Sequence, residues 1–272
     1  MSGTLLAVDG DSLAHRAYHA IPKSIKGNGR PANALVGFAG FLMRLWDAEQ
    51  PEAVLVGWDT LETPTYRHEA LPAYQSGREF EPAILEQLGR LPGLTESFGF
   101  LVGKAPGYEA DDFLAAGART WPGPVTVVTS DRDAFQLVSD RVTILQPVKG
   151  VSELTRVGPA EVRERYGVEP EQVPDFIALR GDPSDKIPGA PGVGPKKAAD
   201  VLKQHGSLPQ ALADGRFPQI ADDLLLYLSI ATMDGDAPLP KLTATPPDWA
   251  GARAYAQEAG LNALANRLAE RI

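Results

Sequence analysis

Short hydrophobic runs recur in the first half of the chain, and an acidic residue stands at or just after the end of each run. Three runs are rich in β-branched residues, a pattern typical of buried parallel strands: residues 4–8, 53–57 and 125–129. The acids that follow them are Asp9, Asp59 and Asp131. Because the carboxyl ends of parallel strands meet at one edge of a sheet, we expect these aspartates to lie in one crevice.

Helical patterns separate the strands and then dominate the rest of the chain. Residues 34–47 and 111–119 carry apolar positions at helical spacing between strands. Beyond Val151 the helical patterns cover residues 159–166, 170–179, 196–205, 222–233 and an alanine-rich tail at 251–271. Alternating strands and helices predict an α/β fold with a central, mostly parallel sheet and flanking helices. We predict this domain over residues 1–165 and a helical C-terminal region over residues 166–272.

Residues 61–92 show little periodicity before residues 84–91. A connection of this length inside a compact domain is usually either functional or disordered. The stretch contains Tyr66, Arg67 and His68, followed by Tyr74 and Arg78. This mixture of aromatic and basic residues favours a lid that faces nucleic acid rather than an ordinary surface loop.

Composition narrows the class of protein. The 272 residues include no cysteine, which excludes disulfides, zinc–thiolate sites and a cysteine nucleophile. The N-terminus has no basic region before its apolar run, unlike a signal peptide, and no apolar stretch approaches the ~20 residues of a membrane helix. We therefore expect a monomeric protein in the cytoplasm.

The formal net charge is −9, although nucleic-acid-binding proteins usually carry a basic face. Nine acids gather in the motifs described here. Without them, the 35 acidic residues fall to 26, which equals the number of lysines and arginines. Net charge therefore does not exclude a nucleic-acid substrate.

Acidic residues gather in three further motifs: residues 107–112, 130–133 and 181–185. Acids in a first helical turn also offset the helix dipole, which explains one or two of them but not the joint pattern. Carboxylates that converge without counter-charge repel one another, and divalent cations remove that repulsion. Ligands that are all oxygen atoms favour Mg²⁺ or Mn²⁺ over Zn²⁺. Two such ions are a recurrent device for phosphodiester hydrolysis.

A glycine-rich turn, Gly192-Val193-Gly194, precedes a helix whose first turn suits Pro195. Glycines let backbone N–H groups approach a phosphate, and a helix N-terminus favours an anion. Lys196 and Lys197 would add charge without base specificity. A plain connection between two helices, with solvated lysines, remains the alternative interpretation.

These motifs resemble, in order and spacing, those of the 5′-nuclease (flap endonuclease) family. The matching segments are Val8-Asp9-Gly10, Trp58-Asp59, Tyr66-Arg67-His68-Glu69, and residues 107–112, 130–133 and 181–198. The likeness covers nearly the whole chain and is greatest to the 5′→3′ exonuclease domain of bacterial DNA polymerase I and its free-standing relatives. It implies a PIN-like core that hydrolyses DNA by two metal ions at 5′ ends and flaps, as in primer or flap removal during replication and repair.

The resemblance also implies roles for particular residues. The implied metal ligands are Asp9, Asp59, Glu109, Asp111, Asp112, Asp131, Asp133, Asp182 and Asp185. Catalytic roles are implied for Arg16, beside the scissile phosphate, and for Tyr74 and Arg78 in an arch at residues 61–92. A helix–two-turn–helix module at residues 181–205, which often holds K⁺ in the family, would bind duplex DNA. The implied DNA-binding residues are Arg67, Gly192, Gly194, Lys196 and Lys197. The expected partner is DNA with a 5′ end, flap or nick, RNA–DNA primers included.

One position departs from the family pattern, because Gln75 stands where the arch usually carries a lysine. The loss of a positive charge predicts a slower enzyme that depends more on its metals and on Arg78. Three alternatives stay open. Asp9-Gly10-Asp11-Ser12 imitates the motif of haloacid-dehalogenase-type phosphatases, which leaves residues 107–112 unexplained. PIN-type ribonucleases are usually shorter, and a non-catalytic binder of branched DNA would be expected to lack some of the acids.

Overall fold

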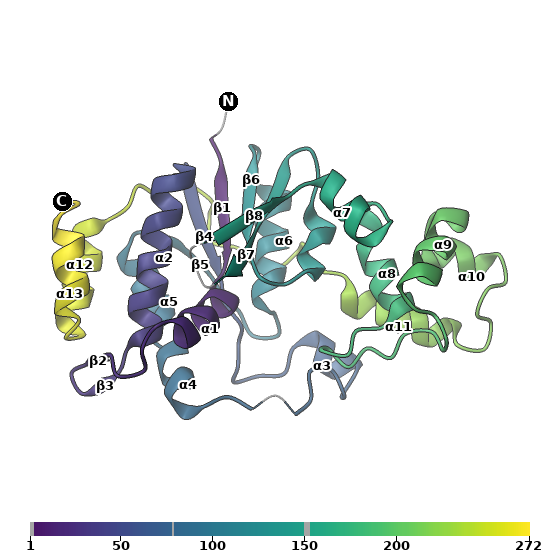
Figure 1. The fold of residues 1–272 in the computed structure, drawn as a ribbon, viewed down its shortest axis with the longest axis horizontal. Helices are drawn as coiled ribbons and strands as arrows, with labels where there is room; N and C mark the ends of the chain where they lie inside the picture. Colours follow the sequence, from purple (N-terminus) through teal and green to yellow (C-terminus); the bar gives the residue numbers. More distant parts are fainter. Residues whose placement is uncertain (1–2, 78, 150–152) are drawn as a thin grey trace.

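The computed structural model describes residues 3–77, 79–149 and 153–272. Its centre is a six-stranded sheet with the order β5-β4-β1-β6-β7-β8 (Figure 1). The parallel strands are β1 (Leu5–Asp9), β4 (Ala53–Gly57), β5 (Leu101–Gly103), β6 (Val125–Val128) and β7 (Val142–Lys149). The edge strand β8 (Glu153–Val157) is antiparallel to β7. The predicted mostly parallel sheet is confirmed.

Alternate residues of β1 face two separate hydrophobic cores, because side chains of a strand alternate between the faces of its sheet. Leu5 and Ala7 pack in the core that contains residues of α6 (Ala110–Thr120). Leu6 and Val8 pack in the core built on α2 (Asn33–Glu49) and α5 (Leu91–Ser97). A strand covered on both faces requires a continuous hydrophobic run, which is the pattern that predicted it.

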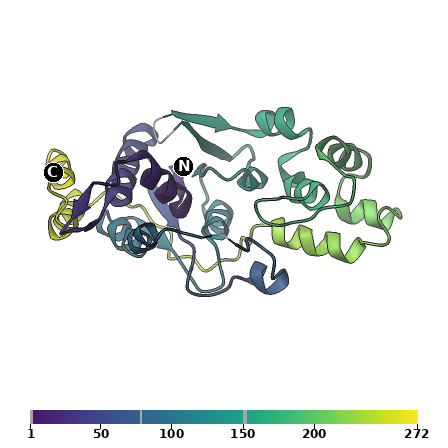
Figure 2. The same ribbon diagram turned by 60° about the horizontal axis from the view of Figure 1, so that its bottom comes forward.

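The predicted lid at residues 61–92 connects two parts of the molecule. Its first helix, α3 (Tyr66–Ala70), contacts α11 (Ala221–Ala231), and α4 (Pro82–Leu88) contacts α1 (Gly10–Ala20). The chain between α3 and α4 runs along the lower side of Figure 1 and comes forward in Figure 2. The segment therefore bridges the sheet domain and the C-terminal helices.

Beyond β8 the regular secondary structure is helical, with a long connection between α11 and the last two helices. The chain forms α7 (Pro159–Tyr166), the 3₁₀ helix η2 (Pro170–Gln172), α8 (Val173–Arg180), α9 (Pro195–His205), α10 (Leu208–Ala213) and α11. The last helices, α12 (Trp249–Glu258) and α13 (Asn262–Ala269), lie at the opposite end of the molecule from α9 and α10 and join the core of α2 and α5 (Figure 1). Within the described residues, no helix combines the length and apolar character needed to cross a membrane.

The shorter elements complete the fold. A two-stranded ribbon consists of β2 (Lys26–Gly27) and β3 (Arg30–Pro31), and it follows α1. A 3₁₀ helix, η1 (Asp133–Leu137), lies between β6 and β7. It begins at Asp133, an acid of the motif at residues 130–133, so it places that acid near the carboxyl end of β6.

Candidate active site

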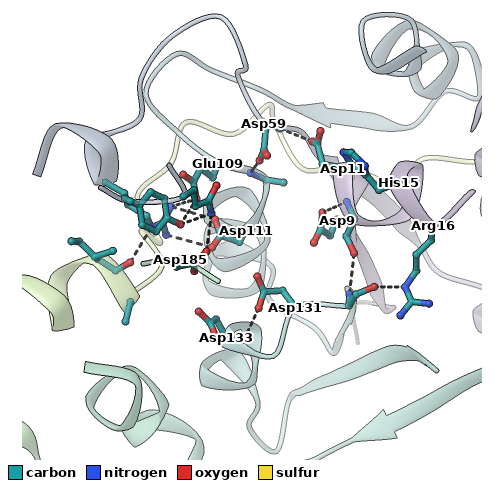
Figure 3. A pocket seen from close by; sticks show the side chains of 18 of the residues that line it. Asp9, Asp11, His15, Arg16, Asp59, Glu109, Asp111, Asp131, Asp133 and Asp185 are labelled. Carbon is teal, nitrogen blue, oxygen red and sulfur yellow. Dashed lines mark hydrogen bonds and ion pairs between the residues drawn. The ribbon is translucent and has the colours of Figure 1, made fainter. Parts of the chain in front are cut away.

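The carboxyl edge of the sheet borders an open cleft of about 580 Å³. Its walls come from the ends of β1, β4 and β6, the starts of α1 and α6, the segment between α3 and α4, and the loop after α8. Eight acidic side chains line it (Figure 3): Asp9, Asp11, Asp59, Glu109, Asp111, Asp131, Asp133 and Asp185. Seven of these belong to the predicted set, and Asp11 is an addition.

Hydrogen bonds fix two of the strand-end aspartates. Asp9 accepts a hydrogen bond from the Ser12 amide at 2.9 Å, and so caps α1, and another from the Thr129 hydroxyl at 2.6 Å. Asp59 accepts one from the Ala110 amide at 2.7 Å, at the start of α6. Because an acid at a helix start satisfies an otherwise unpaired amide, each carboxylate is tied to the helix beside its strand.

Asp11, His15 and Phe80 line the cleft although they were not among the predicted site residues. Asp11 accepts a hydrogen bond from the Asp59 amide at 2.7 Å. The rings of His15 and Phe80 lie 5.0 Å apart between centroids. The signal for Asp11 was present in the sequence, since it lies two residues after Asp9 in the same motif. No pattern in the sequence singles out Phe80.

Arg16 also lines the cleft, and it projects from α1 as Asp11 and His15 do (Figure 3). Its guanidinium donates hydrogen bonds to the Ser130 hydroxyl and, at 2.9 Å, to the Pro147 carbonyl. These contacts hold the positive charge beside the acids.

Arg67 is buried, with 1% of its surface exposed. Its guanidinium lies 3.0 Å from Glu109, 2.8 Å from Asp112 and 3.4 Å from Asp111, and its Nε donates to the Ile230 carbonyl at 3.0 Å. The DNA contact expected of Arg67, which also lines the cleft, stays a prediction. The side chain neutralises the acids of α6 and joins α3 to α11.

Asp112 is fully buried behind the cleft. Besides its bonds to Arg67, its carboxylate accepts hydrogen bonds from the Tyr66 hydroxyl at 3.0 Å and from the amides of Glu109 at 3.1 Å and Asp234 at 2.8 Å. Protein donors thus occupy the lone pairs that a metal ion would need. Asp112 is thus a partner of Arg67 in this structure, and the metal role expected for it stays a prediction.

Tyr74 and Gln75 join the two sides of the cleft. The Tyr74 hydroxyl donates to Glu109 at 3.0 Å. The Gln75 side-chain amide donates to the Tyr74 hydroxyl at 2.8 Å and to Asp185 at 3.2 Å. The position that departs from the family pattern therefore contacts a candidate metal ligand. Arg78 lies outside the described residues.

Asp182 does not line the cleft, although it lies near enough to Asp133 to raise the pKa of that carboxyl. Its own carboxylate accepts hydrogen bonds from Arg180 at 3.0 Å and from the Ser184 amide at 2.8 Å. The metal role of Asp182 stays a prediction.

The glycine-rich turn lies at the start of α9, with Gly192 in the left-handed region at φ 72°. A Cβ placed on Gly192 or Gly194 would meet no atom within 4 Å. Lys196 and Lys197 are exposed, and Lys197 donates to the Gly192 carbonyl at 2.9 Å. Backbone and lysines are therefore accessible to a phosphate here.

Burial and mutual repulsion raise the pKa of several carboxyl groups in the cleft. The pKa of Asp9 rises to about 7, first because burial disfavours the charged form and also because Asp59 and Asp131 repel it. Burial likewise raises the pKa of Glu109 to about 7, although Arg67 opposes the shift. Burial also raises the pKa of Asp11, Asp111 and Asp133.

These shifts predict that the metal-free protein is more stable in mild acid. Because the pKa of Asp9 and of Glu109 is higher in the folded than in the unfolded state, folding takes up protons between about pH 4 and 7, and the stability this gives is lost as the pH rises through 7. In EDTA, we expect the melting temperature to fall by several degrees from pH 5 to pH 8, and Mn²⁺ at pH 8 to restore it. An Asp9→Asn variant should show a shallower dependence; a melting temperature that rises with pH in EDTA would contradict this account.

The acids that line the cleft fit hard divalent cations, because they offer only oxygen ligands. Within the described residues, no three acidic or histidine side chains already form a closed metal-binding group. Mg²⁺ usually retains several water ligands and binds through one or two carboxylates together with substrate phosphates. An open, acid-lined cleft is suited to ions that are shared in this way.

Two family models match consecutive parts of the chain. The 5′-3′ exonuclease N-terminal resolvase-like domain matches residues 4–167, and the 5′-3′ exonuclease C-terminal SAM fold matches residues 168–248. The chain belongs to the 5′-3′ exonuclease family. This assignment confirms the resemblance inferred from the motifs and favours a nuclease over the phosphatase alternative.

Relatives of this chain include DNA polymerase I of Mycobacterium tuberculosis, which is 45% identical over 211 residues, 75% of this chain and 23% of the relative. The thermostable DNA polymerase I of Thermus thermophilus is 37% identical over 278 residues, 96% of this chain and 33% of the relative. The chain thus spans about a quarter to a third of the length of these curated relatives.

Solved structures share the fold of this chain. T5 5′-exonuclease with bound zinc ions superposes with a TM-score of 0.69 at 18% identity, covering 98% of both chains. The catalytic core of Rad2 in complex with a DNA substrate gives 0.59 at 14% identity, covering all of this chain and 92% of the Rad2 chain. At these identities the likeness shows a common fold.

Proposed function

We propose that this family member is a structure-specific 5′-nuclease, which hydrolyses DNA as a 5′→3′ exonuclease and as a 5′-flap endonuclease. The observation that carries the proposal is the cleft, where strand ends and helix starts bring eight carboxylates beside Arg16. The DNA bound in the Rad2 structure and the metal ions in the T5 exonuclease structures support it. Its setting would be replication and repair in the cytoplasm, on flaps, nicks and RNA–DNA primers, with the protein acting as a monomer.

Two or more Mg²⁺ or Mn²⁺ ions would supply an activated water and stabilise the leaving oxygen. The residues that would hold them are Asp9, Asp59, Glu109, Asp111, Asp131, Asp133 and Asp185, which line the cleft, together with Asp112 and Asp182. Arg16 would orient the scissile phosphate, since its guanidinium is already fixed beside the acids. Tyr74 would keep Glu109 in place through its hydroxyl. We also propose that the turns of the 181–205 module bind a K⁺ ion.

The function is tested by incubating the protein with a nicked duplex, a 5′-flap duplex and a 3′-flap control, each with Mg²⁺, Mn²⁺ or EDTA. Metal-dependent release of short products from the first two substrates alone is expected. Binding of the 5′ flap without cleavage under any metal would instead support the non-catalytic binder, and cleavage of the 3′ flap at the same rate would exclude a 5′-specific enzyme.

The glycine-rich turn before α9 would bind duplex phosphates. Replacing Lys196 and Lys197 together by alanine should weaken DNA binding equally across sequences and reduce the salt slope of log Kd by about 2, because each lysine neutralises about one phosphate. Fluorescence anisotropy with two unrelated duplexes over a salt series measures both effects. Lys203→Ala, on the last turn of the same helix, is the control. An unchanged slope would show that the two lysines are only solvated.

Gln75 offers a test of the arch. A lysine at this position would bring a positive charge to Asp185 and the cleft, where a growing negative charge is stabilised most strongly in the absence of water. Gln75→Lys should therefore raise the single-turnover rate on a 5′ flap with little change in affinity, whereas Gln75→Met should not. A rate that is unchanged or lower in Gln75→Lys would show that this side chain does not act on the phosphate.

A further inference from the structure

A second cleft, of about 690 Å³, lies under the first part of the arch. Its walls come from the loop that follows β4 and from residues 60–72. It shares four lining residues with the acid-lined cleft: Asp59, Gln75, Phe80 and Glu109. The two clefts therefore adjoin at these residues, and a strand that crossed the acids would enter the second cleft.

The arch is fastened on both sides of this passage. On one side, Gln75 contacts Asp185 through its side chain at 3.2 Å and through its backbone amide at 3.3 Å. On the other, Glu81 accepts hydrogen bonds from the Tyr18 hydroxyl and from Lys23, both at 2.7 Å. A strand in the second cleft would therefore lie close to the side chains of residues 60–75.

The two clefts differ in the charge that they offer a phosphate backbone. The acid-lined cleft includes Arg16. The described residues that line the second cleft include the exposed side chains of Glu62 and Glu69, and among those residues there is no lysine or arginine. Lys104, at the neighbouring loop, exerts its charge on Asp11.

The other lining groups of the second cleft do not offset these acids. They are threonine, proline and leucine residues, with His68, whose ring contacts the Thr65 hydroxyl at 2.8 Å and packs against Tyr74. Arg67 of α3 is not among the lining residues of the second cleft, and three carboxylates already hold its guanidinium. Each nucleotide that passes beyond the acids would bring a phosphate charge against Glu62 and Glu69, with no lysine or arginine among the described lining residues to offset it.

We propose that the acidic lining of the second cleft restricts this enzyme to 5′ termini and short 5′ flaps. The proposal rests on the proposed 5′-nuclease function and names its substrate class. A terminal nucleotide needs only the acid-lined cleft with its metals and Arg16. A long displaced strand adds phosphates in the second cleft, so each added nucleotide there disfavours binding, and the products are short oligonucleotides.

The experiment compares kcat/KM on a nicked duplex and on 5′ flaps of about 1 to about 30 nucleotides, with Mg²⁺, between about 50 and 200 mM salt. Efficiency should fall as the flap grows beyond the length that fills the passage. The ratio of long-flap to nick cleavage should rise with salt, because screening weakens the repulsion between the strand and the glutamates. Salt weakens the binding of every DNA substrate, and this general loss cancels in the ratio of long-flap to nick cleavage.

The variant Glu62→Lys with Glu69→Lys should raise this ratio roughly ten-fold, since four units of charge change beside the strand, and should leave the nick substrate unaffected. Glu62→Gln with Glu69→Gln should give a smaller rise. Glu96→Lys, an exposed position on α5, is the matched control for added charge. Circular dichroism melts check that each variant is folded.

Several results would overturn the proposal. Equal efficiency at all flap lengths in the parent, or a length dependence that the lysine variant leaves unchanged, would show that the acidic lining does not select the substrate. A ratio that rises equally in Glu96→Lys would assign the effect to general attraction of DNA. Failure to cleave the nicked duplex and every flap with any metal would remove the proposed function itself, and the inference with it.

Discussion

An Asp133→Asn variant is expected to cleave a 5′ flap roughly 10²–10³-fold more slowly than the parent. Asp133 lines the cleft, and Asp131 and Asp185 lie near enough to raise its pKa, after the larger effect of burial. Asparagine keeps the shape of the side chain but removes the charge, so it is a much weaker ligand for a divalent cation. The same change relieves repulsion, so the fold should be at least as stable as that of the parent.

Single-turnover cleavage with Mg²⁺ measures this loss, and anisotropy in Ca²⁺ measures whether flap binding persists. Asp140→Asn, at an exposed turn, is the matched control and should cleave at the parent rate. If Asp133→Asn cleaved at the parent rate, or if the parent cleaved equally in EDTA, the metal-dependent mechanism would be wrong.

Replacing Arg67 by methionine is expected to destabilise the protein by about 3–5 kcal/mol, because it leaves buried carboxylates without their counter-charge. The melting temperature should then fall by roughly 10 °C. The melting temperature of Arg67→Lys should lie between those of the parent and of Arg67→Met, since an ammonium cannot form the paired bonds that the guanidinium makes to Asp112. Loss of the bond to Ile230 should also loosen the contact between α3 and α11.

Thermal melts at pH 8 measure these effects, and a second substitution separates charge from packing. Asp112→Asn in the Arg67→Met background should recover part of the stability, because it removes the carboxylate that is buried most deeply. Arg163→Met, which breaks an exposed pair with Glu169, should cost less than about 1 kcal/mol. If Arg67→Met melted within a degree of the parent, the buried network would not contribute to stability.

The hydrophobic pattern predicted the strands at the centre of the sheet and missed those nearer its edges. β1, β4 and β6 are covered on both faces, so each needs an uninterrupted apolar run. β7 includes Gln146 and Pro147, and β8 is mostly exposed. Such strands are stabilised by the neighbour that they pair with, and the local sequence does not record which neighbour that is.

The sequence by itself determined that acids would gather at the carboxyl edge of the sheet, because strand direction and the position of each acid after its strand are local properties. Which acids face the cleft was decided only by the tertiary structure. Asp111 and Asp112 are adjacent on α6, and successive helical side chains point roughly 100° apart. Asp111 therefore lines the cleft, 3.4 Å from Arg67, whereas Asp112 is buried against the same guanidinium, which comes from α3, more than 40 residues earlier in the chain. The sequence could not distinguish a buried arginine from one that contacts DNA, because burial depends on elements that are distant in the chain.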